Sequence, residues 1–182
     1  MTYPRCMLLA LAGLVFAPAT GRAQDRDLEA KLPAPVKKTF RAHFPKAVIE
    51  KVESEEEGGV TVYDIEFRDG TVEKETDITA DGTMLEFTVV IEAKDVPEAA
   101  MKPIRKAADG ATMKRIERIE ISYKTKDGKA IKLPKPVTHY AVEMSKGIRS
   151  TEIVVAPNGE VIEPARWDGD QEKKKSAGEA RK

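Results

Sequence analysis

The sequence predicts an α+β fold of two tandem repeats, each with the order helix, strand, strand, strand and a possible fourth strand. The repeats are expected to share an antiparallel sheet with the helices packed on one face. Three observations lead to this prediction. Apolar residues recur at helical spacing from Leu32 to Phe44, apolar and polar residues alternate from Thr61 to Arg68, and the whole pattern returns further along the chain.

The predicted helix of the first repeat has one apolar face. Leu32, Val36, Phe40 and Phe44 lie four residues apart, the spacing that places side chains on one side of a helix. Pro33 lies near the expected start, where the missing N–H costs little because the first turn leaves that donor without a helical partner.

The predicted strands follow this helix. Thr61, Tyr63, Ile65 and Phe67 alternate with more polar residues, which is typical of a strand buried on one side. The dipeptides at 69–70 and 81–82 are both Asp-Gly, a sequence that favours tight turns. Two further strands are therefore expected at 71–79 and 84–91.

The repeat is seen when the sequence is aligned with itself, and two different shifts are needed. A shift of 64 residues aligns the apolar positions of 32–52 with those of 96–116. A shift of 77 residues aligns Tyr63–Phe67 with Tyr140–Met144, and the Asp-Gly turn at 81–82 with Asn158-Gly159. The difference predicts 13 extra residues between the first and second strands of the second copy.

The start and end of the chain differ from the repeats. Residues 1–23 have a basic start, an apolar run and the small residues Gly21 and Ala23, which together predict a secretory signal peptide. The expected organisation is then a first repeat at 24–94, a second at 95–167 and a polar, disordered tail at 168–182. The predicted location is periplasmic or secreted, without a transmembrane anchor because no later apolar run is long enough.

Composition excludes several functions. The chain has 31 basic and 31 acidic residues, so a nucleic-acid partner is not expected, since such proteins need excess Lys and Arg. Its only cysteine, Cys6, lies in the predicted signal peptide, and His43 and His139 are far apart in the sequence. No nucleophile elbow or phosphate-binding loop occurs. We therefore expect no catalytic residues, no metal site and no cofactor, and predict that the protein is not an enzyme.

Each copy resembles the PepSY-like group of exported bacterial proteins. The residues that carry this resemblance are the helix motif from Leu32 to Ala47, the strand Val62–Phe67 and the segment Asp77–Leu85 with its Asp-Gly turn. The second copy repeats them at 96–116 and 139–162 but lacks the aromatic residues of the helix. The resemblance implies a fold similar to that of a secreted β-lactamase inhibitor protein. It also implies binding or inhibition without a catalytic centre, and it names no target.

One candidate binding surface is acidic. If Tyr63, Ile65 and Phe67 face the helix, the charged residues between them face the other side of the sheet. The carboxylates expected on that side are Asp64, Glu66, Glu75, Glu143 and Glu152. They could dock a basic partner through complementary charge, or they could simply keep an exposed sheet face soluble.

A second candidate surface is basic. The 13 extra residues fall in the segment 122–136, which reads as a protruding hairpin around Asp127-Gly128. Its candidate binding residues are Lys124, Lys126, Lys129 and Lys132. The matching loop of the first copy is short and acidic. The hairpin could reach into a partner or contact an anionic polymer, or its lysines could protect a sheet edge from pairing.

These observations predict an exported, non-catalytic binding or inhibitory module. Its expected partner is a protein, such as an enzyme that it inhibits. The alternative is a structural or sensing protein of the cell envelope that binds an anionic polymer through the basic hairpin.

Overall fold

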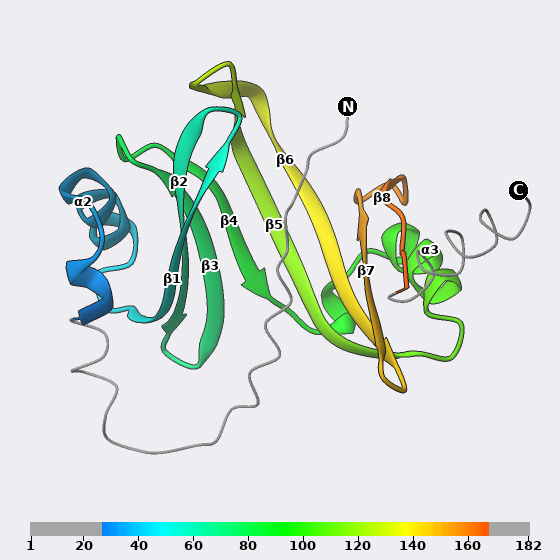
Figure 1. The fold of residues 1–182 in the computed structure, drawn as a ribbon. Coiled ribbons are helices and arrows are strands. Elements are labelled where there is room, and N and C mark those ends of the chain that lie inside the picture. Colours follow the sequence, from blue (N-terminus) through cyan, green and yellow to red (C-terminus); the bar gives the residue numbers. More distant parts are fainter. Residues whose placement is uncertain (1–26, 168–182) are drawn as a thin grey trace, which may run out of the picture.

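A computed structural model of the chain describes residues 27–167, which form an antiparallel sheet of eight strands with helices beside it (Figure 1). The elements follow in the order α2 (Ala34–His43), β1 (Val48–Glu57), β2 (Val60–Asp69), β3 (Val72–Thr79), β4 (Met84–Val90), the short 3-10 helix η1 (Ala93–Asp95), α3 (Glu98–Ala108), β5 (Thr112–Lys126), β6 (Lys129–Lys146), β7 (Arg149–Val155) and β8 (Val161–Glu163). The predicted α+β class and tandem repeat are confirmed, because a helix followed by four strands occurs twice.

The sheet is continuous, and its strands are arranged in chain order from β1 to β8. Every ladder is antiparallel, including the one between β4 and β5 that joins the two copies. In that ladder Thr88 lies opposite Ile119 and Glu86 lies opposite Ile121. The two copies therefore share one sheet, as the sequence predicts.

The first copy has its core between α2 and strands β1 to β3. Val36 and Phe40 of α2 are fully buried, and they pack with residues such as Ile65 and Ile78. The rings of Phe40 and Phe67 meet edge to face, with centroids 5.0 Å apart. Aromatic side chains bury a large apolar area, so this pair anchors the helix on its half of the sheet.

The second copy has a core of the same kind with smaller side chains on its helix. Ala100 and Ile104 of α3 are fully buried against Val142 and Met144 of β6. The aromatic residues of the first helix are absent here. Strands β6 and β7 contribute larger buried side chains to this core, among them Tyr140 and Ile153.

The turn after the third strand packs on the start of the helix in both copies. In the first copy, the Thr39 hydroxyl donates a hydrogen bond of 2.7 Å to the carbonyl of Gly82. A methyl group added to Gly82 would lie 3.0 Å from the carbonyl oxygen of Pro35. In the second copy, a methyl group on Gly159 would overlap the carbonyl oxygen of Ala99. Gly82 and Gly159, which the repeat aligns, therefore both allow the turn to pack closely against the backbone of the helix.

The extra 13 residues of the second copy lengthen its first two strands. Strand β5 has 15 residues and β6 has 18, whereas β1 and β2 have 10 each. Both hairpins keep a two-residue turn. The pairing shifts between Ile121 and Tyr123, and β6 passes through Pro134 and Pro136 at this irregularity. Proline has no N–H to donate and is tolerated where a ladder is interrupted.

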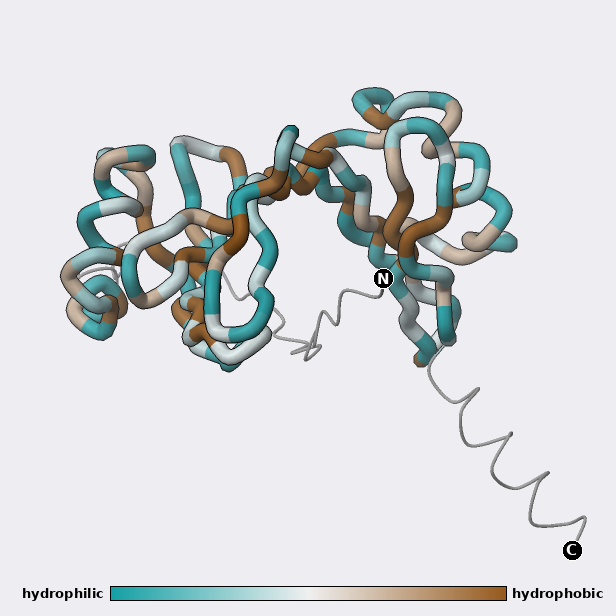
Figure 2. Tube along the Cα trace, turned by 90° about the horizontal axis from the view of Figure 1, so that it is seen from above, coloured by the Kyte–Doolittle hydropathy of each residue, from teal (hydrophilic) through white to brown (hydrophobic). Residues whose placement is uncertain are grey.

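The sheet is strongly bent, and its two halves form the two limbs of an arch when seen from above (Figure 2). A side-chain contact across β4 accompanies this curvature. Arg115 of β5 reaches Glu73 of β3, with 2.9 Å between Nη1 and the carboxylate oxygen. Side chains two strands apart thus meet on the inner side of the bend.

Three expectations about chain organisation are not tested by this structure. The predicted signal peptide at 1–23 and the predicted disordered tail at 168–182 lie outside the described residues. The predicted boundary between residues 94 and 95 falls within η1 and stays a prediction. Among residues 27–167, no helix has both the length and the apolar character needed to cross a bilayer.

Candidate functional site

One face of the sheet carries aligned rows of carboxylates, and we call it the acidic face. Residues that lie directly opposite in neighbouring strands share a face. One row runs through Glu53, Asp64, Asp77, Glu86 and Ile121. A second row runs through Lys51, Glu66, Glu75, Thr88, Ile119 and His139. These rows alternate along the strands with the residues that pack on α2, such as Ile65 and Ile78.

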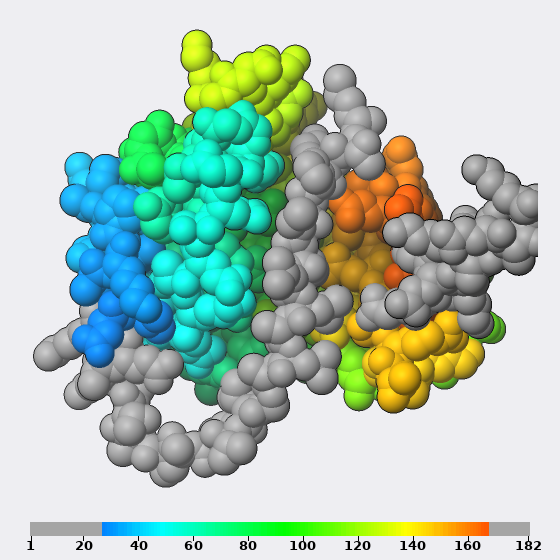
Figure 3. Space-filling view, in the orientation of Figure 1, coloured from blue at the N-terminus to red at the C-terminus, as the bar shows by residue number. Residues whose placement is uncertain are grey.

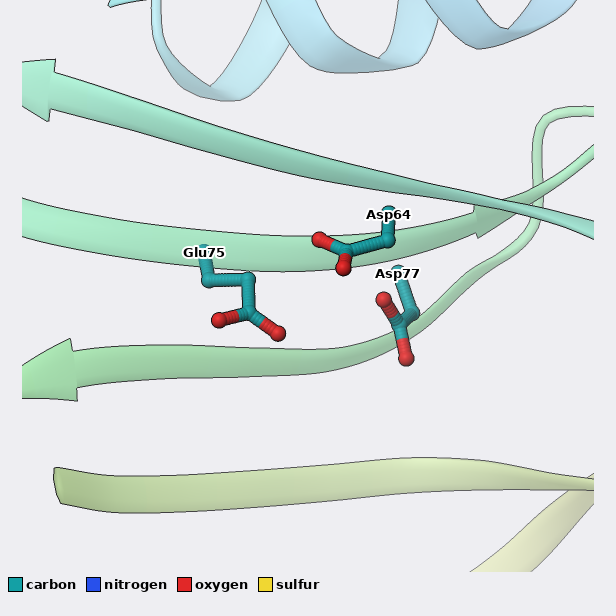
Figure 4. Close-up of side chains that lie close together, drawn as sticks. All are labelled: Asp64, Glu75 and Asp77. Carbon is teal, nitrogen blue, oxygen red and sulfur yellow. The ribbon is translucent and has the colours of Figure 1, made fainter. Parts of the chain in front are cut away.

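Three carboxylates of these rows lie close together. Asp64, Glu75 and Asp77 each have an oxygen within 4.8 Å of the others, and all three side chains are half-buried (Figure 4). Two of them are predicted site residues, whereas Asp77 was not among the candidates. Like charges at this separation repel each other. Carboxylates of three residues are therefore concentrated at this point of the acidic face.

Two cations hold other carboxylates of the acidic face. Lys51 lies 2.9 Å from Glu66 and 3.0 Å from Glu53. Burial alone would lower the pKa of Lys51, but its hydrogen bonds to these two carboxylates outweigh it and raise the pKa. The predicted site residue Glu66 is therefore engaged in an ion pair within the chain.

Arg115 has the same role further along the face. Its Nε lies 2.6 Å from an oxygen of Glu117, in addition to its contact with Glu73. Burial opposes the charge of this guanidinium, but the hydrogen bond and the charge of Glu117 raise the pKa of Arg115 overall. Glu117 is almost fully buried, so this pairing satisfies a carboxylate that would otherwise be costly to bury.

The remaining acidic candidates lie on the second limb. Glu143 of β6 is opposite both Arg115 of β5 and Glu152 of β7. Both glutamates are half-buried. They alternate with Tyr140, Val142 and Met144 of the α3 core. The structure thus places all five predicted carboxylates in aligned rows, but it separates this pair from the cluster on β2 and β3.

The basic candidates occupy the long hairpin between β5 and β6, on both of its sides. Lys126 lies opposite Lys129, and Lys124 lies opposite Ile131, so these three lysines share one side. Lys132 lies opposite Tyr123 on the other side. Lys124 is half-buried, whereas Lys126, Lys129 and Lys132 are exposed.

The tip of this hairpin is bound to the β1–β2 turn, and we call this contact the clasp. The amide of Gly128 donates a hydrogen bond of 2.8 Å to the carbonyl of Gly58, and the hydroxyl of Thr125 donates one of 2.7 Å to the carboxylate of Glu57. Figure 3 shows the hairpin above the β1–β2 region. The expected protruding hairpin is therefore folded back onto the first copy.

Glycine makes the close approach in the clasp possible. Gly58 has a φ of +57°, and a methyl group on it would lie 3.0 Å from atoms of Thr125. Gly59 has a φ of +81° and packs against Gly128. Such backbone conformations are readily adopted only by glycine. Nothing in the residues around Gly58-Gly59 indicates that this turn contacts Thr125 and Gly128.

The clasp can be tested through Thr125→Val, which removes one hydrogen bond while keeping the shape of the side chain. We expect a local loss of about 0.5–1.5 kcal/mol, seen as several-fold faster hydrogen exchange at the Gly128 amide. Lys126→Gln is the matched control, because it changes the charge of the hairpin without removing either bond. Unchanged exchange in Thr125→Val would contradict the role given to this contact.

An apolar strip on the acidic face was not predicted. Ile119, Ala141 and Val154 are buried together, with Ile121 and Ile162 packed against them. In the sequence, Ile119 and Ile121 alternate with Arg118 and Glu120, which is the pattern of a strand with one apolar side. It could not show that this side lies beside carboxylates from four other strands.

The two histidines lie in different environments. His43 at the end of α2 is exposed, and its Nδ1 lies 3.0 Å from the carbonyl oxygen of Thr39. His139 of β6 is buried in the second row of the acidic face. The structure does not bring these two side chains together, because α2 and β6 belong to different halves of the fold.

Solved structures of similar fold come from Bacteroides species. A "putative periplasmic" protein of Bacteroides eggerthii is 14% identical with a TM-score of 0.56, and the match covers 75% of this chain and 88% of that one. A DUF2874 family protein of Bacteroides uniformis is 17% identical with a TM-score of 0.54, covering 74% and 88%. Another DUF2874 family protein, from Bacteroides ovatus, is 14% identical with a TM-score of 0.54, covering 77% and 90%. At these identities, the likeness concerns the fold alone.

The family comparison is more specific. No curated protein matches the chain significantly. The family described as "Putative beta-lactamase-inhibitor-like, PepSY-like" matches twice, at residues 28–86 and 61–133. The two matches overlap and together extend over more than half of the chain. With the repeated order of one helix and four strands, they establish that the chain belongs to the PepSY-like family.

Proposed function

We propose that this protein is an exported, non-catalytic binding module whose acidic face holds a basic segment of a protein partner. The observation that carries the proposal is the set of aligned carboxylate rows on a concave sheet face. The family is described as inhibitor-like, which supports binding as the activity. If the partner is an enzyme, the bound module inhibits it by covering the surface that it contacts.

The proposal requires that the acidic face be free of helices, so we infer that α2 and α3 lie on the other face. The cross-strand partners support this inference. One row runs through Phe67, Lys74, Val89, Arg118, Tyr140 and Val155. Phe67 belongs to the core under α2, whereas Tyr140 and Val155 belong to the core under α3. Both cores therefore lie on the same side of this row.

The shape and charge of the acidic face favour a partner that is basic and narrow. The bend of the sheet lets carboxylates of several strands surround one segment, as the contact between Arg115 and Glu73 across β4 illustrates. Complementary charge mainly increases the association rate and the selectivity for a partner. A segment with Lys or Arg beside apolar residues fits both the carboxylates and the apolar strip.

The test uses a variant that neutralises the cluster, Asp64→Asn with Glu75→Gln and Asp77→Asn. We expect the wild-type protein to form a stoichiometric, salt-sensitive complex with a protein from an envelope extract of the organism that produces it. The triple variant should bind that protein at least about tenfold more weakly, because the complementary charge is lost. Size-exclusion chromatography followed by titration with the purified partner measures both.

The matched control removes the same charge elsewhere. Glu56→Gln with Glu98→Gln and Glu120→Gln alters three exposed glutamates that do not belong to the carboxylate rows, and this variant should bind as the wild type does. Equal affinity of the two triple variants for the purified partner would contradict the proposal.

A second candidate function rests on the hairpin, where Lys126 and Lys129 face each other and are exposed. In that case the protein is an envelope component that binds an anionic polymer. Retention on a sulfated polysaccharide column that is lost in Lys126→Gln with Lys129→Gln and Lys132→Gln, but kept in the cluster variant, would favour this second function over the first.

A further inference from the structure

The outer part of the long hairpin is joined to the rest of the sheet only at its base. The last pair between β5 and β4 is Ile121 with Glu86, and the first pair between β6 and β7 is Tyr140 with Val155. Beyond these pairs, residues 123–132 form a ladder with one another and with no other strand of the described part of the chain. We call this segment the flap. In Figure 1 it lies at the top, beyond the end of β7.

The base of the flap is a break in the ladder between β5 and β6. Pairing stops after Ile121 and resumes at Tyr123, so one residue of β5 faces residues 133–136 of β6. Two of these four residues are prolines, which have no N–H to donate to a ladder. Because no cross-strand pair forms within the break, the backbone is less restrained there than in the ladders on either side. Hinges form at such short, weakly restrained segments.

The tip of the flap is held by the clasp, which contains little apolar surface. Its two hydrogen bonds join Gly128 to Gly58 and Thr125 to Glu57. No flap residue belongs to any of the hydrophobic clusters of the described residues, and Ile131 of the flap is 40% exposed. Segments with few buried apolar contacts open at a lower free-energy cost than the core does. The clasp is therefore the contact of the flap that can be released.

The two copies stay joined when the clasp opens. Five cross-strand pairs connect β4 to β5, and these do not involve the flap. On the acidic face, Glu73 lies 3.0 Å from Arg68 and 2.9 Å from Arg115, and Arg115 also pairs with the buried Glu117. Release of the clasp would therefore move the flap alone and leave the junction of the copies intact.

The flap closes one end of the apolar strip. Its residues Tyr123, Lys124 and Thr125 line a small cavity together with Ile119 and Ile121 of the strip. The volume of this cavity is about 70 Å³, which leaves room for only a few water molecules. Movement of the three flap residues away from the sheet would widen the cavity on the side of the clasp.

We propose that residues 123–132 form a hinged flap, which opens when the clasp is released and gives a protein partner access to one end of the apolar strip. The chain bends at the break between Ile121 and Tyr123. This inference rests on the proposed function for what enters, and it deepens that function by naming the segment that controls entry. The motion itself needs no partner. The closed form is the major one, because both hydrogen bonds of the clasp are formed in the structure.

The motion can be measured by ¹⁵N relaxation dispersion, which detects the microsecond-to-millisecond range in which hinge motions fall. We expect exchange with one common rate at the amides of Gly58, Gly128 and Tyr123, and none at Gly147 in the β6–β7 turn. Thr125→Val should raise the open population roughly threefold to tenfold, because one of the two clasp hydrogen bonds is lost. Lys126→Gln should leave it unchanged. Absence of exchange at the clasp in both the wild type and Thr125→Val would overturn the proposal.

A covalent lock tests whether this exchange comes from the flap. A methyl group on Gly58 would lie 3.1 Å from Cβ of Thr125, and a disulfide spans roughly 3.5–4.5 Å between its β-carbons. Gly58→Cys with Thr125→Cys, in a Cys6→Ser background that removes the only other thiol, should therefore form a disulfide after a small shift. The oxidised protein should show no exchange at Tyr123, and reduction should restore it. Exchange that persists in the oxidised protein would refute the flap as its source.

The same variant separates this inference from the proposed function. The oxidised form should bind the purified partner at least about tenfold more slowly than the reduced form, because the binding-competent open state is no longer populated. Equal association rates of the two forms would refute the control of entry by the flap and leave the proposed function standing. Exchange that the disulfide abolishes, in a protein that forms no charge-dependent complex, would support the hinged flap and remove the proposed function.

Discussion

Gly159→Ala is expected to destabilise the protein by about 2–5 kcal/mol, measured by urea denaturation followed by circular dichroism. Two costs combine. Gly159 has a φ of +87°, a conformation that costs an alanine about 1–2 kcal/mol. The added methyl group would also overlap the carbonyl oxygen of Ala99 at the start of α3, and relieving such a clash typically costs about 1–3 kcal/mol.

Two other glycines provide graded controls for this change. Gly147 has a φ of +63° with no atoms within 4 Å of an added methyl group, so Gly147→Ala should cost only the conformational term of about 1–2 kcal/mol. Gly82→Ala, with a 3.0 Å contact to Pro35, should fall between the two. Equal losses in Gly159→Ala and Gly147→Ala would show that the turn does not press on α3 as described.

Phe40→Ala is expected to cost about 3–5 kcal/mol, the usual range for removing a buried phenylalanine side chain. Phe40 is fully buried and contacts the rings of both Phe44 and Phe67, with centroids 5.5 and 5.0 Å away. Its loss would leave a cavity at the centre of the first core. Thermal unfolding and urea denaturation at neutral pH measure the change.

Lys38→Ala is the matched control on the same helix. Lys38 is exposed, so its replacement should change the free energy of unfolding by less than about 0.5 kcal/mol. A loss of similar size in both variants would mean that the first helix is held by something other than its aromatic face.

The sequence was sufficient for the parts of the fold that depend on local pattern. The four-residue spacing of Val36 and Phe40 predicts α2, and the alternation of Ile65 and Phe67 predicts β2. The shift between the two repeat frames predicts the 13 extra residues, and these appear as added length in β5 and β6. Each of these signals lies within a short stretch of chain or compares two such stretches.

The candidate site was predicted less completely because it depends on which strands become neighbours. The sequence placed Asp64 and Glu75 on one side of the sheet, but only the register brings Asp77 beside them. The clasp depends on a contact between Glu57 and Thr125, which are 68 residues apart. The hairpin was predicted as a free arm because nothing in its own residues indicates that the β1–β2 turn lies within reach.

The arrangement of the strands in chain order has a consequence for how the protein acquires its structure. Each ladder joins strands that are consecutive in the chain, so pairing requires the closure of mostly short loops, and short closures carry a small entropic cost. Two neighbouring strands can therefore pair without waiting for distant parts of the chain. We therefore expect the sheet to assemble hairpin by hairpin, with the clasp closing late because it joins residues 68 positions apart.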